Sequence, residues 1–449
     1  MKQTESSEME PRGRVRRMAG WILFPLLALA GFEPVEGQQN EDGFSFGWEV
    51  KGHLRDSEEV RFPSPVVLPF PAELVTVEAG EHAELSVVTL NLFYNRPWFR
   101  ARAKIDAIDL HERNPTSEDR EVDLDELWVM FGRGAPSGVM PQDDWGAYAR
   151  IGKFAKFERQ NDRHLESYGL VSTAFNRLED AGVEFGLDIG RHLYARASIT
   201  QGNPVFIRDP NALAGDNGID IRLDQPVQVE RESGIVILYD AEVEYDLDFD
   251  EPEVGLGLGL RFGDPAGYWV FDLLGFWYQR DLQDTVDLEG TQYGGDLDAL
   301  LGPFNSVGLG VTGREKEESG ATLWFYRGGL SVFAQFVDQD IAGLERVGQE
   351  IELAWRIPLP GNLSLGGYRL FESIAPSVRY SELDNENFGG SSEFPAVSVR
   401  WDWDKWDYGV RLDLWRGLDL TLERADNTFV VRGNDRTMEE TLFTLRWRR

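Results

Sequence analysis

Apolar and polar residues alternate one by one along most of the chain after residue 43, and a period of two is the spacing of a β-strand with two unlike faces. Such runs begin near residues 44, 99, 183, 193, 254, 351, 397, 408 and 441. Strands of about ten residues with charges on one face are typical of a membrane barrel, whereas soluble sandwiches favour about five or six residues. The pattern therefore predicts an all-β fold, a transmembrane antiparallel β-barrel with lipid outside and water inside.

The connections between the runs are of two kinds. Tight turns lie at 190–192, 263–267 and 358–362, and long polar segments lie near 156–180, 202–233, 281–303 and 383–393. Short turns at one end and long loops at the other are typical of outer-membrane barrels. We expect about 16 strands (16–18) in a single barrel over residues 38–449, with 56–82 forming either a loop or a small inserted hairpin.

Tryptophans near the ends of the runs predict aromatic girdles at the two membrane interfaces, although core tryptophans are the alternative. The residues concerned are Trp98, Trp128, Trp145, Trp324, Trp401, Trp403, Trp406 and Trp447. In the run at 397–404, Trp401 and Trp403 share the apolar face, and Asp402 and Asp404 share the polar one.

The N-terminus has the three parts of a secretory signal peptide. Arg12, Arg14, Arg16 and Arg17 precede the apolar run 18–32, and Pro34-Val-Glu-Gly37 follows it. We therefore expect residues 1–37 to be a signal peptide, cut near Gly37. The chain has no cysteine, so an exported fold must be held by other means, and a closed ladder of backbone hydrogen bonds would serve.

The chain is strongly acidic, with 45 basic against 78 acidic side chains and a net charge of −33. This excess argues against nucleic acid as a partner. Two interpretations stay open: solvated acidic loops, or a field that attracts cations to a pore mouth.

The sequence lacks the motifs of common enzymes, so we expect no enzyme, no metal and no cofactor. The five histidines show no zinc-site spacing, and no serine nucleophile elbow is present. The glycine pattern 308–313 is followed by 314–320, which we interpret as a charged turn rather than the helix that a dinucleotide site needs. Asp209, Asn211, Asp216 and Asn217 offer oxygen ligands for calcium, but their spacing also fits polar turns.

Two groups of cations stand out. Arg100, Arg102 and Lys104 share one strand face, and a second group surrounds a strand that ends in a long loop, namely Arg150, Lys153, Lys156, Arg159 and Arg163. If that loop folds into the lumen, it narrows the pore and presents its charges to permeating ions. If it projects outward, the same charges are solvated.

The second group lies where the chain resembles a known family. The segment Arg150-Ile-Gly-Lys-Phe154, a loop of mixed charge and the strand Gly182-Val-Glu-Phe-Gly186 resemble the phosphate-selective porin O and P family and related outer-membrane porins, over about 120–202. The resemblance implies a sixteen-stranded, typically trimeric channel whose basic residues guide anions. The acidic balance and the final Arg449, where this class usually ends in an aromatic residue, depart from the pattern; Trp447 stands two places before the end.

Together these features predict a porin of the outer membrane, a water-filled channel for passive diffusion of small solutes, anions among them. The expected partners are outer-membrane lipid and lipopolysaccharide, small hydrophilic solutes or ions, and two further copies in a homotrimer. The alternatives are a substrate-specific transporter or exporter of a polysaccharide or an apolar compound, a barrel-embedded lipid hydrolase, and a soluble secreted β-protein.

Overall fold

The computed structural model describes residues 43–58, 60–63, 73–77, 80–108, 122–161, 163–167, 169–175, 179–202, 249–264, 266–282, 312–361, 364–365, 368–385, 402–431 and 434–449. The expected signal peptide, 1–37, lies outside these residues. So do the four oxygen ligands considered for calcium and nearly all of the loops at 202–233 and 281–303.

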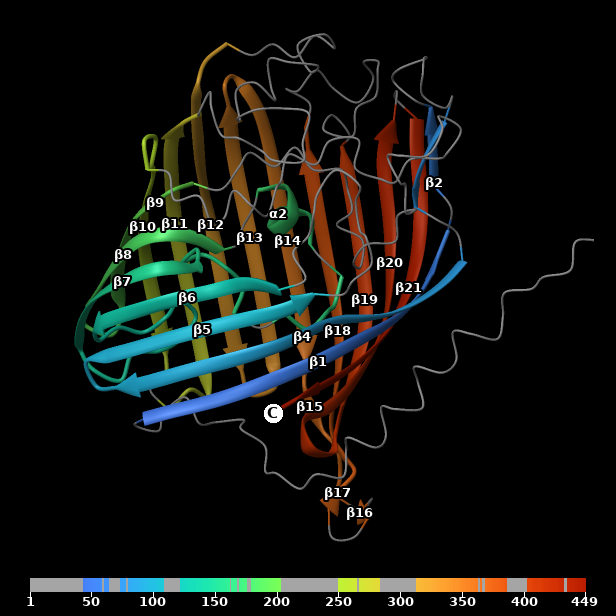
Figure 1. Ribbon diagram of the computed structural model, residues 1–449, viewed down its shortest axis with the longest axis horizontal. Coiled ribbons are helices and arrows are strands. Elements are labelled where there is room, and N and C mark those ends of the chain that lie inside the picture. Colours follow the sequence, from blue (N-terminus) through green and yellow to red (C-terminus); the bar gives the residue numbers. More distant parts are fainter. Residues whose placement is uncertain are drawn as a thin grey trace, which may run out of the picture.

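Sixteen antiparallel strands form one closed barrel in the described part of the chain (Figure 1). In chain order they are β1 (Gly43–Ser57), β4 (Gly80–Arg96), β5 (Phe99–Ile108), β6 (Val122–Gly132), β7 (Trp145–Ala155), β8 (Glu179–Ile189), β9 (Leu193–Thr200), β10 (Glu253–Gly263), β11 (Trp269–Asp281), β12 (Glu315–Arg327), β13 (Leu330–Ile341), β14 (Leu344–Trp355), β18 (Phe371–Asp384), β19 (Trp403–Leu414), β20 (Leu418–Val431) and β21 (Asn434–Arg448). Each pairs with its neighbours in sequence, and β1 pairs with β21 to close the ring. The expected fold class and strand number are confirmed.

The remaining elements are short. β2 (Val60–Pro63) and β3 (Glu73–Val77) form a small inserted hairpin, the second of the two alternatives for 56–82, and β15 (Ile357–Pro358) continues the line of β14. β16 (Ser364–Leu365) pairs with β17 (Tyr368–Arg369), and Trp415–Gly417 form a 3-10 turn, η7. The helix α2 (Leu170–Ala174) is discussed below. Among the described residues, no helix has the length and apolar character needed to cross a membrane.

The alternation along the strands divides outside from inside. On β10, Leu256 and Leu258 are 50% and 68% exposed on the outer face, whereas the inward Arg261 is 1% exposed. Apolar residues therefore cover the outside and polar residues line the interior, the reverse of a soluble core. Glycines such as Gly259 on the inner face leave room for the ring of Tyr194 from β9, because a Cβ there would lie 2.0 Å from its Cζ.

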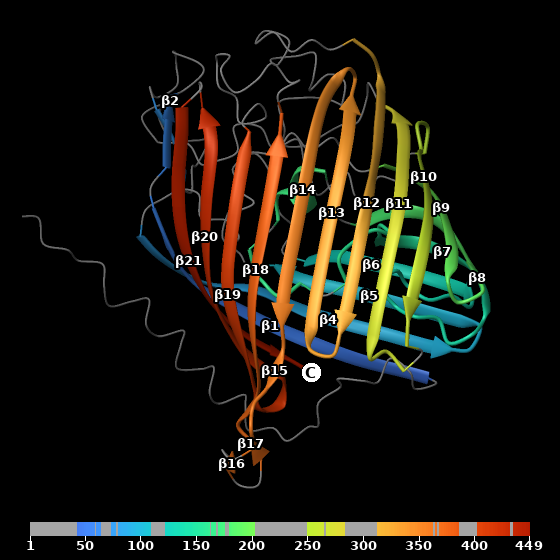
Figure 2. The ribbon, with the colours of Figure 1, turned by 180° about the vertical axis from the view of Figure 1, so that it is seen from behind.

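The two ends of the barrel differ. The turns 97–98, 190–192, 264–268, 328–329 and 415–417 lie at one end, which we call the short-turn end (Figure 2). β1 begins and β21 ends there, and the longer connections from β6 to β7 and from β14 to β18 leave the strands at the same end. The brief turn 342–343 lies at the opposite end, which we call the long-loop end. The seam closes at Arg449, whose backbone N–H donates to Trp48 O at 2.8 Å. Arg449 thus completes the ladder where an aromatic residue would usually stand.

The aromatic prediction is only partly correct. Trp98, Trp145 and Trp406 are exposed, and Trp447 packs edge-on against Trp48 with ring centroids 4.5 Å apart. In contrast, Trp128, Trp324 and Trp403 point into the barrel, and Trp324 is fully buried there. Trp401 lies outside the described residues.

Two assignments of strand face or type were wrong. Trp403 lies on the inner face and Asp404 on the outer, because the described strand begins at Trp403 in phase with the inward Lys405 and Asp407. Residues 315–320 are not a charged turn, because they begin β12, with Lys316 and Glu318 buried inside. A strand can carry charge on both faces where it rises beyond the hydrocarbon layer, so hydropathy alone does not mark such an end.

Candidate pore constriction

The segment 156–175 leaves β7 and crosses the lumen before it returns to β8 (Figure 1). Its residues contact the far wall: the backbone N–H of His164 and the Nε2 of Gln160 donate to Glu352 of β14, at 3.1 and 3.0 Å. Farther round the wall, the backbone N–H of Glu166 donates to Glu423 of β20 at 2.7 Å. The loop therefore folds into the barrel, the first of the two interpretations.

Apolar side chains of α2 and of the residue after it, which together we call the apolar wedge, hold the segment 156–175 in place. Leu170 and Val171 of α2 and Phe175 beyond it are almost fully buried, in one cluster with Val337 of β13. Arg346 donates from Nη2 to Ala174 O at 2.6 Å and lies over the ring of Phe175, 4.8 Å from its centroid. Packing and charge together hold α2 against β13, β14 and β18.

A second segment, 133–142, enters from the short-turn end. The backbone N–H of Gly138 donates to Asp272 of β11 at 2.6 Å, and Arg261 of β10 donates to Val139 O at 2.9 Å. The two segments meet where Ser137 Oγ donates to Phe157 O at 2.8 Å. Asn161 also donates from Nδ2 to Ser137 O at 2.6 Å. Together they fill the lumen along β9–β14 and on round to β18–β20.

The inner wall opposite these segments stays accessible. The side chains of Arg102, Lys104 and Arg150 are 27%, 23% and 17% exposed, whereas Arg196 and Arg261 on the filled side are at most 2% exposed. The water-accessible part of the lumen therefore runs along β4–β7.

The cations of that wall are paired with acids from neighbouring strands. Arg102 Nη1 lies 2.9 Å from Glu126 Oε1, and Arg150 Nη2 lies 2.5 Å from Glu184 Oε2. Lys104 Nζ lies 2.5 Å from Asp125 Oδ2 and 3.1 Å from Asp106 Oδ2. 

Arg100 differs from these cations, since its Nη2 donates to the backbone carbonyl of Gly134 at 2.9 Å. The described residues give Arg100 no ion pair. The predicted row thus exists on the inner wall, but its acids offset most of its charge.

The expected loop cations separate into three positions. Lys156 is buried, with its Nζ 2.5 Å from Glu253 Oε1 and 4.5 Å from the centre of the Tyr278 ring, so it secures the start of the segment. Arg159, about one third exposed, pairs with Glu179, and Arg163 is half-buried. Lys153 lies on the outer face, where the register sets it opposite Leu127. Lys153 is therefore not brought to the lumen.

Burial and charge act in opposite directions on Glu166, which lies midway along the segment, beside β1 and β21. Burial raises its pKa, but Lys51, Arg446 and Arg163 lower it more, so that the pKa lies well below the usual value for glutamate. The Nζ of Lys51 is 3.4 Å from Glu166 Oε2, and Arg446 Nη1 is 3.3 Å from Oε1. Glu166 therefore stays charged and ties the segment to β1 and β21.

One group of acids in the described part of the chain, Asp125, Glu126 and Glu179, is close enough to share an ion. Each already faces a cation, from Lys104, Arg102 and Arg159 respectively. A divalent metal would have to displace these cations, so the donor set fits an internal ion-pair network better than a metal site.

No protein-family model and no curated protein matches the chain. Among solved structures, the outer membrane channel DcaP of Acinetobacter baumannii is 10% identical, with a TM-score of 0.50, over 94% of this chain and 100% of that one. OprB of Pseudomonas putida is 9% identical, with a TM-score of 0.49, over 91% and 94%. The anion-selective porin from Comamonas acidovorans is 9% identical, with a TM-score of 0.45, over 91% and 100%. At this identity, the likeness to DcaP shows a common barrel fold alone.

Proposed function

We propose that the protein is an outer-membrane porin, a water-filled channel through which small hydrophilic solutes diffuse passively. The observation that carries the proposal is the division of the wall, with apolar residues outside and partly exposed charges along β4–β7 inside. A segment fixed across the lumen then sets the width of the passage. The similarity to DcaP, an outer membrane channel, supports the same function.

The proposal extends to the surroundings of the barrel. Outer-membrane lipid and lipopolysaccharide cover the outer face, residues 1–37 direct export, and three copies associate as the resemblance to phosphate-selective porins implies. The resemblance to phosphate-selective porins supports anions among the solutes. The pairing of Arg102, Lys104 and Arg150 with acids supports a weak rather than a strict selectivity.

Planar-bilayer recording tests the channel directly. Purified protein, refolded into detergent and added to a lipid bilayer, is expected to give stepwise increases of current in KCl. A barrel that inserts, as judged by protease protection in vesicles, and gives no steps would refute the porin function.

A substrate-specific channel is the second candidate, and the filled lumen favours it. Two segments occupy the lumen along β9–β14 and β18–β20, which leaves less open space than a wide diffusion pore has. The two candidates differ in kinetics: flux through a general pore rises linearly with solute concentration, whereas a specific channel saturates. Vesicle uptake measured over a concentration series distinguishes them.

A further inference from the structure

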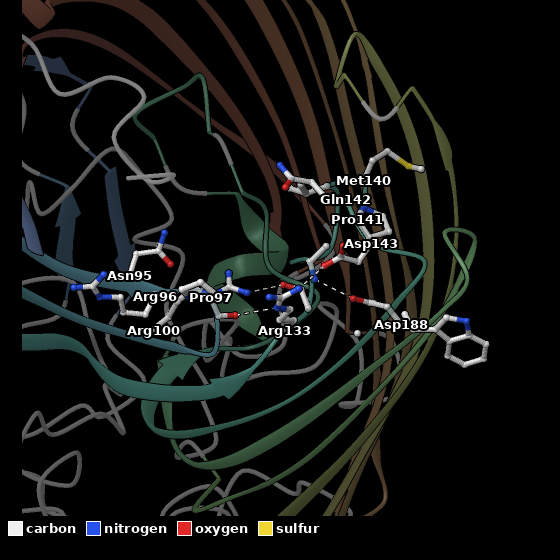
Figure 3. A pocket seen from close by; sticks show the side chains of 15 residues that line it. Asn95, Arg96, Pro97, Arg100, Arg133, Met140, Pro141, Gln142, Asp143 and Asp188 are labelled. Carbon is white, nitrogen blue, oxygen red and sulfur yellow. Dashed lines mark hydrogen bonds and ion pairs between the residues drawn. The ribbon is translucent and has the colours of Figure 1, made fainter. Parts of the chain in front are cut away.

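A cavity of about 460 Å³ lies at the short-turn end, between the β4–β5 turn and the inward segment 133–142 (Figure 3). Three arginines from different elements line it: Arg96 ends β4, Arg100 lies on β5, and Arg133 follows β6. A cavity of this size accommodates a small molecule. The segment 156–175 does not line it.

The cavity is locally positive although the chain as a whole is acidic. Two acids line it, Asp143 and Asp188, against the three arginines. Asp188 is buried and already engaged, since it accepts from Arg196 Nη2 at 3.1 Å and from the backbone N–H of Ala135 at 3.0 Å. Asp143 lies 3.3 Å from Arg133. An anion entering the cavity therefore meets an excess of positive charge.

Arg100 is the cation best placed to receive an anion. Its Nη2 donates to Gly134 O at 2.9 Å, which orients the guanidinium, and the described residues supply no carboxylate within ion-pair distance. A guanidinium can bind a carboxylate through two parallel hydrogen bonds. Half-buried and without an ion pair, Arg100 gains more from an incoming anion than an exposed arginine does.

The floor of the cavity is fixed in advance. Arg196 donates to Ala135 O at 2.7 Å, Arg261 donates to Val139 O at 2.9 Å, and Asp272 accepts from the Gly138 N–H at 2.6 Å. A preformed floor reduces the ordering that binding would otherwise require.

Apolar side chains complete the lining of the cavity, and they favour a ligand that has an apolar part as well as a negative charge. Val139, Met140 and Pro141 come from the inward segment, and Pro97 comes from the β4–β5 turn. Val139 is 44% exposed although it belongs to the folded-in segment. A hydrated inorganic anion gains nothing from this surface, whereas the alkyl chain of an organic anion gains about fourfold in affinity for each CH₂ that it buries.

We propose that this cavity binds small organic anions, carboxylates on a short apolar body, at the short-turn mouth of the pore. The proposal rests on the porin function and names a solute class for it. Arg100 binds the carboxylate, Arg96 and Arg133 supply the surrounding positive potential, and Val139 and Met140 contact the apolar body.

Equilibrium dialysis of the full chain in detergent against radiolabelled hexanoate, acetate or inorganic phosphate tests the proposal. Hexanoate is expected to bind at least about tenfold more tightly than acetate or phosphate, because only hexanoate uses the apolar lining. Arg100→Gln is expected to weaken hexanoate binding about tenfold or more. Arg327→Gln, which removes an exposed cation at the same end away from the cavity, is the matched control and should leave binding unchanged.

Equal binding by wild type and Arg100→Gln, or tighter binding of phosphate than of hexanoate, would overturn the site. Bilayer conductance in KCl, recorded on the same preparations, separates this result from failure of the porin. Normal current steps without hexanoate binding refute the cavity alone, and hexanoate binding without current steps refutes the channel alone.

Discussion

Arg379 of β18 shows how a single charge is held inside this barrel. Its Nη2 lies 2.8 Å from Asp407 Oδ2 and donates to Ser167 O at 2.7 Å, while its Nη1 lies 3.6 Å from Glu352 Oε2. The arginine thus joins two wall strands to the inward segment. Burying these charges is costly, and the arrangement is stable only while every partner is present.

Arg379→Met is therefore expected to destabilise the barrel by about 3–5 kcal/mol, because Asp407 and Glu352 lose their shared cation while buried. Urea unfolding of the protein in detergent measures the change. The exposed Arg327→Gln should change the free energy of unfolding by less than about 0.5 kcal/mol. Equal effects of the two substitutions would mean that the interior is wet enough to solvate the carboxylates.

Arg102, with about a quarter of its side chain exposed on the inner wall, lies where a permeating ion would pass. Arg102→Ser is expected to shift the reversal potential in a KCl gradient towards preference for cations, because the carboxylate of Glu126 then loses its nearest cation. Lys153→Gln is the control, since Lys153 lies on the outer face and should leave the reversal potential where it was. A shift of the same size from both would place the ion path elsewhere.

The constriction depends on the two inward segments, 133–142 and 156–175. A substitution at Gly138 tests how closely the first packs against the second. Its φ is +75°, and a Cβ would lie 2.6 Å from Asn161 Nδ2 and 3.1 Å from Trp324 Cγ. Gly267 has nearly the same φ, +76°, but open space around it. The pair separates backbone strain from packing.

Gly138→Ala is expected to destabilise the protein by about 1–3 kcal/mol more than Gly267→Ala does, since both incur the strain and only the first overfills the joint between the segments. Thermal unfolding in detergent gives the comparison. Identical losses would show that 133–142 is not packed against 156–175 as described.

The pH dependence of the crossing segment follows from Glu166. Its pKa in the folded protein lies below the ordinary value of 4.5, so its contribution is fully present above about pH 4.5 and is lost as the pH falls through the lowered pKa. The difference in melting temperature between wild type and Glu166→Gln should thus be constant from pH 7 to pH 5 and shrink below about pH 4.5. A difference that already shrinks between pH 7 and pH 5 would contradict the ion pairs with Lys51 and Arg446.

Over the whole molecule, the sequence predicts the strands of the barrel wall far better than the segments that fold into the lumen. Alternation on β8, β9 and β10 gives the correct inner and outer faces, because lipid on one side and water on the other impose a strict period of two. Trp324 and Trp403 were misplaced for a related reason: the wedge formed by α2 and its neighbours makes part of the interior apolar. In the sequence, an apolar residue that packs against this wedge cannot be distinguished from one that contacts lipid.

The candidate site shows the same limit. The cations Arg102, Lys104 and Arg150 could be recognised in sequence, but Glu126 and Glu184 become their partners only through the register of separate strands. The cavity around Arg100 is completed by 133–142, a connection whose sequence shows no pattern by which it could be recognised as part of a site. A cluster of like charges in sequence therefore does not predict the net charge of the site that it helps to build.

The central claim is that the outer face contacts lipid while the inner face contacts water, and because the chain has no native cysteine it can be tested with single introduced thiols. Leu258→Cys lies on the outer face of β10, and Arg102→Cys on the accessible inner wall of β5. In lipid vesicles, a charged, membrane-impermeant maleimide is predicted to modify the cysteine at 102 and to spare the one at 258. Modification at 258 with protection at 102 would contradict the account.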